Sequence, residues 1–255
     1  MHSTMKKNKI LEGSLILLFW MFVWWLISSL SNDWIIPSPI TTFQHVINLL
    51  FEGQTYIIIA SSLMRVFIAL IVGIVLGVGF GLLSGMNELI RRTIHPLILV
   101  IKSTPVVSFI IILILYAPKG VVPIICGILL CFPIIHMNVY EGYRMVDKQL
   151  ISMSNVYKVP FKRRLRMLYL PSALPYLFAG VLTSIGICWK ATIAAEVIGV
   201  LDKSIGLQMY NGKVYLDFES VFAWTVIIVI CSLLIEMFAK QLIKRIQFYE
   251  RFKEV

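Results

Sequence analysis

Six long apolar blocks dominate this sequence and restrict what it can fold into. They cover residues 14–30, 57–83, 97–116, 121–139, 174–200 and 221–238. A helix needs about 20 mostly apolar residues to cross the hydrocarbon core of a bilayer, and each block is near or above that length. The blocks lack the short alternation of apolar and polar residues that outer-membrane strands show. The sequence therefore predicts an all-α, polytopic integral membrane protein with about six transmembrane helices.

A soluble helical protein is the main alternative for so apolar a chain. Apolar residues make up 59% of the sequence and charged residues 14%, whereas soluble domains carry about 25% charged residues. A soluble helical bundle would also need polar outer faces on its helices. The six blocks have almost no polar face, so we expect a lipid bilayer around a single transmembrane domain over residues 1–255.

The basic residues are unevenly distributed between the connecting segments. If the first helix leaves the cytoplasm, 17 of the 23 Lys and Arg residues fall in cytoplasmic segments. Lys119, Lys203 and Lys213 fall in external segments. By the positive-inside rule, this asymmetry predicts that both termini are cytoplasmic. The net charge of +10 is then explained by topology, and we expect no nucleic-acid partner.

Four glycines in the second block are spaced four residues apart, so they share one face of a helix. They are Gly73, Gly77, Gly81 and Gly85. Small residues on one face let another helix approach closely inside a bilayer. We predict that this glycine stripe meets another helix, either within the chain or across a dimer.

Prolines predict where the helices are interrupted. Pro37 and Pro39 exclude a helix just before residue 40, and Thr41 or Thr42 is predicted to cap a short outer helix that ends near residue 50. A turn over residues 86–95 is predicted to lead into a third membrane helix over residues 97–116, which contains Pro105. Pro133 lies in the fourth. A proline in a membrane helix frees a backbone carbonyl and therefore usually marks a kink.

The longest polar connection covers residues 141–171 and carries seven basic residues. We predict a short helix over residues 150–158, a break at Val159-Pro160 and a second helix over residues 161–170. Pro171 and Pro175 are predicted to begin the fifth membrane helix. A structured cytoplasmic loop suits docking of a soluble partner, although basic segments also contact lipid headgroups.

This loop carries a motif in modified form. Ser152-Met153-Ser154, Lys158 and Leu170-Pro171 stand at the spacing of E-A-A, a Gly and a closing L-P. In this respect the chain resembles the membrane-spanning permeases of binding-protein-dependent ATP-binding-cassette (ABC) importers. The nitrate/taurine/alkanesulfonate subclass is the most similar. Ser152 stands where the family has Glu, and Lys158 stands where it has Gly.

Other stretches resemble the same family in the same order along residues 30–240. They are Ile36-Pro37-Ser38-Pro39, Ser62-Leu63-Met64-Arg65, Phe132-Pro133-Ile134, Trp189-Lys190, Ala194-Ala195-Glu196 and Ser204-Ile205-Gly206. The resemblance implies a type I ABC importer permease, a multi-pass protein of the prokaryotic plasma (inner) membrane.

The resemblance also implies partners. Such permeases pair, here as an expected homodimer, and the cytoplasmic coupling loop over residues 141–171 seats on a dimer of ABC ATPases. An extracytoplasmic binding protein delivers the substrate, which we expect to be a small polar or anionic organic solute. ATP and Mg are then bound by the ATPase, and we expect no cofactor, metal or catalytic residue in this chain. The expected ATPase-coupling residues are Ser152, Met153, Ser154, Asn155, Val156, Tyr157, Lys158, Val159 and Pro160.

Residues inside the apolar blocks give a candidate translocation path: Lys102, Pro105, Trp189, Lys190 and Glu196. A charge at the centre of a membrane helix costs about 2.5–3.5 kcal/mol, so each charge needs a partner or water. For Lys190 we expect an ion pair with Glu236 or with Glu196 of a second protomer; the alternative is a pore charge for an anionic substrate. Arg65 and Lys102 lie near helix ends and are expected to snorkel.

Missing motifs separate the remaining function classes. The sequence has no G-x-x-x-x-G-K-[ST], no H-E-x-x-H and no G-x-S-x-G, so we expect that this chain is not an enzyme. The main rival function is a secondary transporter with its own binding site. It would need an internal repeat with broken helices in both halves, whereas Pro105 and Pro133 both lie in the first half.

Overall fold

The computed structural model describes residues 2–31 and 35–253, and it describes side chains for residues 12–31 and 35–246. Its helices are α1 (His2–Leu30), α2 (Pro39–Phe51), α3 (Gly53–Met86), α4 (Glu88–Ser103), α5 (Val106–Tyr116), α6 (Val122–Arg144), α7 (Lys148–Val156), α8 (Phe161–Arg164), a π-helical segment (Leu165–Tyr169), α9 (Leu170–Gly199), α10 (Ile205–Val214) and α11 (Phe218–Lys253). Five helical stretches are long and apolar enough to cross a membrane, and the pair α4–α5 makes a sixth if counted as one span. The predicted all-α, polytopic fold is confirmed.

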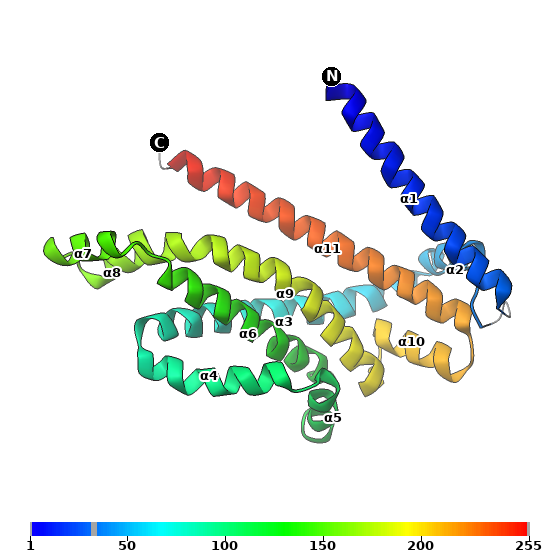
Figure 1. Ribbon diagram of the computed structural model, residues 1–255. Coiled ribbons are helices and arrows are strands. Elements are labelled where there is room, and N and C mark those ends of the chain that lie inside the picture. The colour runs from blue at the N-terminus through cyan, green and yellow to red at the C-terminus, as the bar shows by residue number, and fades with distance from the viewer. Residues whose placement is uncertain (1, 32–34, 254–255) are drawn as a thin grey trace.

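The core lies between α3, α6 and α9. Helix α6 packs against α3 on one side and against α9 on the other (Figure 1). Its buried centre includes Cys131 and Ile135 of α6, Cys188 and Trp189 of α9, and Trp224 of α11. Trp189, predicted to line a path, is thus a core residue.

The glycine stripe of α3 faces α6 within the same chain. A Cβ atom added at Gly73 would lie 2.9 Å from Cys131 Cβ, and one at Gly81 would lie 2.9 Å from Val139 Cβ. The partner helix is therefore α6 of the same chain, and the two backbones approach closely because the stripe carries no side chains.

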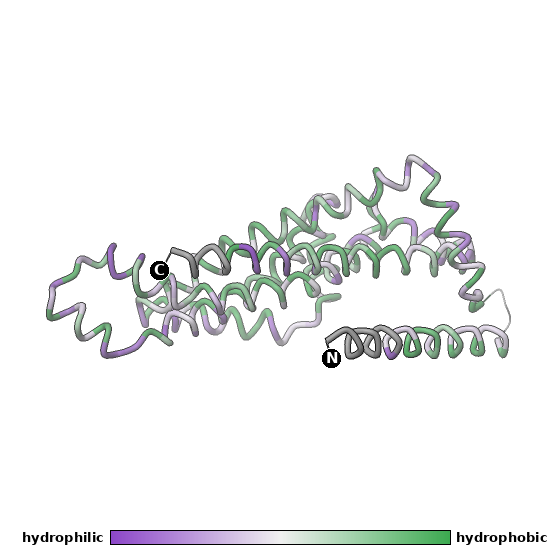
Figure 2. Tube along the Cα trace, turned by 90° about the horizontal axis from the view of Figure 1, so that it is seen from above, coloured by the Kyte–Doolittle hydropathy of each residue, from purple (hydrophilic) through white to green (hydrophobic). Residues whose placement is uncertain are grey.

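Helix α1 stands apart from the other long helices in both views (Figures 1 and 2). Near its C-terminal end Trp24 packs against Phe43 of α2 and stacks on Phe222 of α11, with ring centroids 6.5 and 6.2 Å away. Most of its apolar side chains from Leu15 to Leu30 are exposed. Within one chain, α1 is thus anchored at one end only.

The predicted third membrane helix over residues 97–116 is wrong as a continuous span. The chain breaks between α4 and α5, which are bent by 102°. Pro105 cannot continue the hydrogen-bond ladder of α4, and it begins α5 instead. The predicted turn over residues 86–95 is also wrong, because Asn87 alone separates α3 from α4; its side chain caps α4 by accepting a hydrogen bond from Leu89 N.

The cap of the short outer helix also differs from the prediction. Ser38, and not Thr41 or Thr42, is the N-cap of α2, and its hydroxyl accepts a hydrogen bond from Thr41 N at 3.2 Å. Pro39 occupies the first helical position, where a missing N–H costs nothing. A serine followed by proline is therefore the stronger start signal here.

The helix predicted over residues 161–170 and the fifth membrane helix, which is predicted to begin at Pro171 and Pro175, are continuous. Residues 161–199 form one continuous helical stretch of 39 residues. A π-helical turn over Leu165–Tyr169 ends two residues before Pro171, which lacks the N–H that a regular helix would use. The wider π-helical turn accommodates the proline, so the helix stays continuous.

The two ends of the bundle carry different elements. The α3–α4 turn, α7 and the C-terminal end of α11 lie at one end, whereas α2 and α10 lie at the other (Figure 1). Hydrophilic residues gather toward these ends, including α7, while the long helices between them are mostly hydrophobic (Figure 2).

Candidate functional site

Helices α7 and α8 form a hairpin that projects from one end of the bundle (Figure 1). We call residues 148–164 the α7–α8 hairpin. Asp147 caps α7, since its carboxylate accepts a hydrogen bond from Gln149 N at 2.8 Å. Lys158 ends α7 in the left-handed conformation, with φ of 51°, and Pro160 then begins α8. The predicted helix–break–helix order is present, with the first helix shifted by two residues.

The α7–α8 hairpin exposes large apolar side chains. Val156 is 78% exposed, Tyr157 is 74% exposed, and Met153 is also exposed. They flank a cavity of about 310 Å³ between the two helices, lined by Leu150, Met153, Ser154, Tyr157, Val159, Arg163, Arg164, Met167 and Leu168. Of the nine predicted coupling residues, Ser154 is buried and Val159 half-buried, and the other seven are exposed. The hairpin thus offers an apolar surface rimmed by cations.

The α7–α8 hairpin is firmly joined to two core helices. Its first helix follows the end of α6, and its second continues through the π turn into α9. Tyr143 of α6 and Tyr169 of the π turn stack with ring centroids 4.2 Å apart and planes 8° apart. A hydrogen bond from Arg164 to Asn155 holds α8 to α7. A force on this hairpin therefore acts on α6 and α9 together.

Near the other end of the bundle, a buried carboxylate joins three elements. Glu196 of α9 is fully buried, and its Oε1 accepts a hydrogen bond from Arg65 Nη1 of α3 at 2.8 Å. Its Oε2 accepts from Ser62 Oγ at 2.8 Å and from Gly206 N of α10 at 3.3 Å. Ser62 Oγ also accepts from Ile205 N at 3.0 Å. We call these residues the Glu196 cluster.

The Glu196 cluster corrects the prediction for Arg65 and bears on the one for Lys190. Arg65 does not snorkel, because its guanidinium is paired inside the protein. Within the chain the expected partners of Lys190 have other partners, since Glu196 pairs with Arg65, and Glu236 pairs with Lys240 at 2.6 Å. An ion pair between Lys190 and a second protomer stays a prediction. Glu196 and Trp189 are packed inside one chain, so neither lines an open path in it.

Lys190 lies on the exposed face of α9. Thr183 and Ile187 are exposed on the same face, and a Cβ added at Gly186 would meet no atom within 4 Å. Among the residues whose side chains are described, no carboxylate lies within 4.0 Å of the Lys190 ammonium. A cation in the second half of a membrane helix is therefore left unpaired in the single chain.

Lys102 and Pro105 flank the break between α4 and α5. Lys102 and Ser103 are exposed, and the Thr104 hydroxyl donates a hydrogen bond to Val100 O at 2.7 Å. Of the five predicted path residues, Lys102, Pro105 and Lys190 are exposed and the other two are buried. Interrupted helices at membrane depth occur where the backbone is buried in protein or lines a water-filled cavity.

Sequence reasoning missed that Arg65 and Glu196 form a pair. They are 131 residues apart, so no local periodicity connects them. A chemical signal was available. The two residues carry opposite charges, each lies inside an apolar block, and the positive-inside rule places both near the outer ends of their helices, so a pair was the cheapest arrangement for them.

Comparisons with known proteins agree with this architecture. The family described as "Binding-protein-dependent transport system inner membrane component" matches residues 73–248. A Bacillus subtilis (strain 168) protein named for aliphatic sulfonates transport, the permease protein SsuC, is 24% identical over 228 residues, covering 88% of this chain and 82% of that protein. The taurine transport system permease protein TauC of Escherichia coli (strain K12) is 22% identical over 232 residues, covering 88% and 84%.

Solved structures share the fold. A chain from a bacterial ABC transporter involved in the import of the acidic polysaccharide alginate superposes with a TM-score of 0.66 at 13% identity. The superposition covers 94% of this chain and 97% of that chain. The overall helical fold is thus shared along nearly the full length of both chains.

Proposed function

The chain belongs to the family of binding-protein-dependent transport system inner membrane components and is a permease subunit of an ABC importer, and we propose that it works as a dimer driven by a separate ATPase. In this proposal the α7–α8 hairpin is the docking element for the ATPase, and an extracytoplasmic binding protein delivers the substrate. The chain sits in the inner membrane with both termini in the cytoplasm.

The single observation that carries this proposal is the exposed apolar surface of the α7–α8 hairpin. Val156 and Tyr157 are exposed at the C-terminal end of α7. Helix α7 lies beyond the end of the bundle, where lipid tails would not cover it (Figure 1). Aromatic side chains that fill a partner's pocket dominate binding energy at protein interfaces. The hairpin is also joined at both ends to core helices, so a push on it moves α6 and α9 as a unit.

Docking can be tested by comparing two exposed tyrosines at opposite ends of the bundle. Tyr157→Ala should reduce co-purification of the ATPase and ATP-dependent uptake by tenfold or more, because a well-placed interface tyrosine contributes about 2 kcal/mol or more. Tyr215, which is 78% exposed and follows α10, provides the matched control. Tyr215→Ala should retain the ATPase.

Two outcomes would overturn the docking proposal. One is equal ATPase retention by the two tyrosine variants in membranes. The other is substrate uptake by this chain alone, driven by an ion gradient without any ATPase, which would favour the secondary transporter.

Pairing of two permease copies is supported by the surfaces that one chain leaves uncovered. Helix α1 packs at one end only, and α9 keeps an exposed face that contains small residues and Lys190. Helices that carry small residues on one face pack closely in membranes. Two copies facing each other through α9 would enclose a path between them.

Lys190 then supplies a positive charge to this path. An unpaired ammonium facing lipid would cost about 2.5–3.5 kcal/mol, whereas a water-filled path removes most of that cost. Two copies would place two such cations around the substrate. The relatives named for taurine and aliphatic sulfonates transport carry substrates with a sulfonate group. We therefore propose a small organic anion as the substrate of this chain.

Charge at position 190 can be separated from size by two substitutions. Lys190→Gln should reduce uptake of the anion by about tenfold, the effect of losing roughly 1.4 kcal/mol of favourable interaction. Lys190→Arg keeps the charge and should retain most uptake. Reconstituted vesicles that hold the ATPase and binding protein give both rates. If the Lys190→Gln variant takes up the anion at the wild-type rate, Lys190 does not act as a charge for the substrate.

A further inference from the structure

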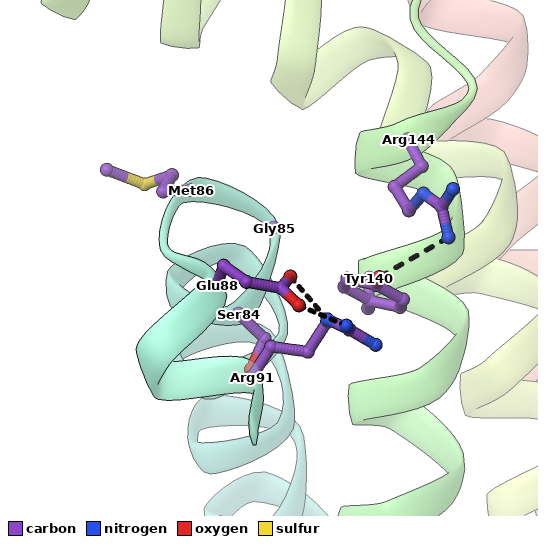
Figure 3. Close-up of a pocket in the computed structure, with 7 residues that line it drawn as sticks. All are labelled: Ser84, Gly85, Met86, Glu88, Arg91, Tyr140 and Arg144. Carbon is purple, nitrogen blue, oxygen red and sulfur yellow. Dashed lines mark hydrogen bonds and ion pairs between the residues drawn. The ribbon is translucent and has the colours of Figure 1, made fainter. Parts of the chain in front are cut away.

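A polar cavity opens between the α3–α4 turn and the end of α6 (Figure 3). Its volume is about 390 Å³, and it is lined by Ser84, Gly85, Met86, Glu88, Arg91, Tyr140 and Arg144. It lies at the end of the bundle that carries the α7–α8 hairpin. Its last lining residue on α6, Arg144, is about one helical turn before the first residue of that hairpin. None of the expected path or coupling residues lines it.

The cavity has more positive than negative charge. Arg91 reaches from α4 toward Tyr140 of α6, and its guanidinium is hydrogen-bonded to Glu88 through both Nε and Nη2 (Figure 3). Glu88 also accepts from Arg92 Nε at 3.1 Å, so one carboxylate serves two arginines. Among the described side chains no carboxylate lies within 4.0 Å of Arg144. Two arginines and one acid therefore line the cavity, and that acid is shared with Arg92 outside it.

Arg144 is held in place by an aromatic ring instead. Its Cζ lies 5.7 Å from the centroid of the Tyr140 ring, and its Nη1 donates to Tyr140 OH at 3.4 Å. Tyr140 in turn stacks on the buried His136 with planes 10° apart, and a 2.9 Å hydrogen bond joins His136 Nε2 to Ser84 Oγ. This column orders the wall that presents Arg144 to the cavity.

We propose that this cavity binds the phosphate of an anionic phospholipid headgroup. Planar guanidinium groups match the oxygens of a phosphate with paired hydrogen bonds, and Arg144 has no carboxylate partner among the described residues to compete for its donors. Arg91, which approaches the cavity from α4, keeps Nη1 free of Glu88 and adds a second positive charge. Basic cavities between membrane helices on the cytoplasmic side bind such headgroups. The excess positive charge of the cavity selects an anion over a zwitterionic headgroup.

The surroundings of the cavity favour a lipid over a free phosphate ion. Met86 and Leu89, on either side of the α3–α4 turn, are exposed, the latter by 72%. A soluble anion would gain nothing from these apolar side chains, whereas acyl chains would cover them. The bound phosphate would bridge α4 and α6 next to the α7–α8 hairpin and so stiffen the base of that hairpin.

Binding can be measured on the purified full chain in neutral detergent by native mass spectrometry. The probes are phosphatidylglycerol, phosphatidylcholine and inorganic phosphate, added separately. The wild type should retain phosphatidylglycerol, and an Arg91→Gln/Arg144→Gln variant should bind it at least tenfold more weakly. A Lys244→Gln/Arg245→Gln variant removes the same charge from the exposed end of α11 and should bind like the wild type. Phosphatidylcholine should bind both double variants and the wild type equally weakly.

The single Arg144→Gln variant covers the case in which the double variant fails to fold, because Arg144 is exposed and has no carboxylate to leave behind. It should weaken phosphatidylglycerol binding several-fold. Equal binding by the cavity variants and the α11 variant would overturn the proposal. Binding of inorganic phosphate as tight as that of phosphatidylglycerol would overturn the lipid assignment in favour of a free anion. Neither result bears on ATPase docking, so the test is independent of the proposed function.

Discussion

The contact between the glycine stripe of α3 and helix α6 can be tested at a single position. Gly77 lies at the middle of the contact, opposite Ile135 of α6. A Cβ atom added there would lie 2.7 Å from both Cβ and Cγ2 of Ile135 and 3.2 Å from His136 N. These neighbours belong to a buried β-branched side chain and to backbone, so neither can rotate away. Gly77→Ala should therefore force the two helices apart.

The size of the effect follows from this distance. Carbon atoms in contact prefer separations of about 3.5–4.0 Å, so the helices must move apart by roughly 1 Å. A gap of 0.5–1 Å forfeits about a quarter to a half of the dispersion energy between the atoms that face it. Overpacking of this kind costs about 1–3 kcal/mol. A loss of about 2 kcal/mol corresponds to a fall in Tm of roughly 4–8 °C for a chain of this size.

The measurement is thermal unfolding of the purified chain, followed by size-exclusion chromatography after heating. Gly79 provides the matched control, because it lies on the same helix and a Cβ there would meet no atom within 4 Å. Both Gly→Ala changes gain the same helix propensity, so the difference between their Tm values isolates the contact with α6. If Gly77→Ala and Gly79→Ala melt at the same temperature, the stripe is not a close-packed surface and the reasoning fails.

Three further predictions concern other parts of the chain. Glu196→Gln should lower stability by up to about 3 kcal/mol, seen as a large drop in Tm, because it leaves the Arg65 guanidinium, which is only 16% exposed, without a counter-charge. Lys158→Gly should raise Tm slightly. A non-glycine residue at φ of 51° costs about 1–2 kcal/mol, and glycine removes this cost. Part of the gain is offset because glycine has more conformational entropy to lose when the chain folds. In intact cells an impermeant maleimide should label Tyr215→Cys and leave Val156→Cys unlabelled, as the predicted orientation requires.

Each of these predictions has an internal control. Glu236→Gln breaks an exposed ion pair with Lys240 and should change Tm little, so an equal effect at positions 196 and 236 would contradict the buried role of Glu196. Lys162→Gly lies in a helix and should lower Tm, and a similar fall for Lys158→Gly would contradict the strain argument. Reversed labelling of the two cysteines would overturn the orientation.

The membrane spans were predictable because backbone N–H and C=O groups find no water to hydrogen-bond in the hydrocarbon core. Each apolar block must therefore form its backbone hydrogen bonds within itself, so its length and apolarity are enough to identify a helix. The break at Pro105 was harder, because a proline in a membrane helix either kinks it or ends it. Pro96 and Pro133 stay inside α4 and α6, whereas Pro105 separates two helices at 102°. Whether a proline kinks a helix or ends it depends on how neighbouring helices pack against it, and this packing cannot be read from the sequence pattern.

The α7–α8 hairpin was predictable from its polarity, but its fine structure was not. The resemblance to ABC importer permeases implies a glycine at the position of Lys158, and the structure gives a physical reason for glycine there. The residue ends α7 at positive φ, so that Val159 N can donate to Ser154 O at 2.9 Å. Glycine reaches this conformation without steric cost, and lysine reaches it at a cost. The turn can therefore form with either residue, and lysine in place of glycine changes the stability of the turn more than its shape.

The Glu196 cluster explains why three short patterns in separate parts of the sequence belong together. Ser62 and Arg65 come from one, Glu196 from the second, and Gly206 from the third. A Cβ at Gly206 would lie 2.4 Å from Glu196 Cβ and from Val197 N, so only glycine lets α10 approach closely enough for its N–H to reach the carboxylate. Because the cluster ties α3 and α10 to the end of α9, a displacement that enters α9 from the α7–α8 hairpin must carry α10 with it. We therefore expect Gly206→Ala to impair uptake without weakening ATPase docking, which we propose for the opposite end of α9.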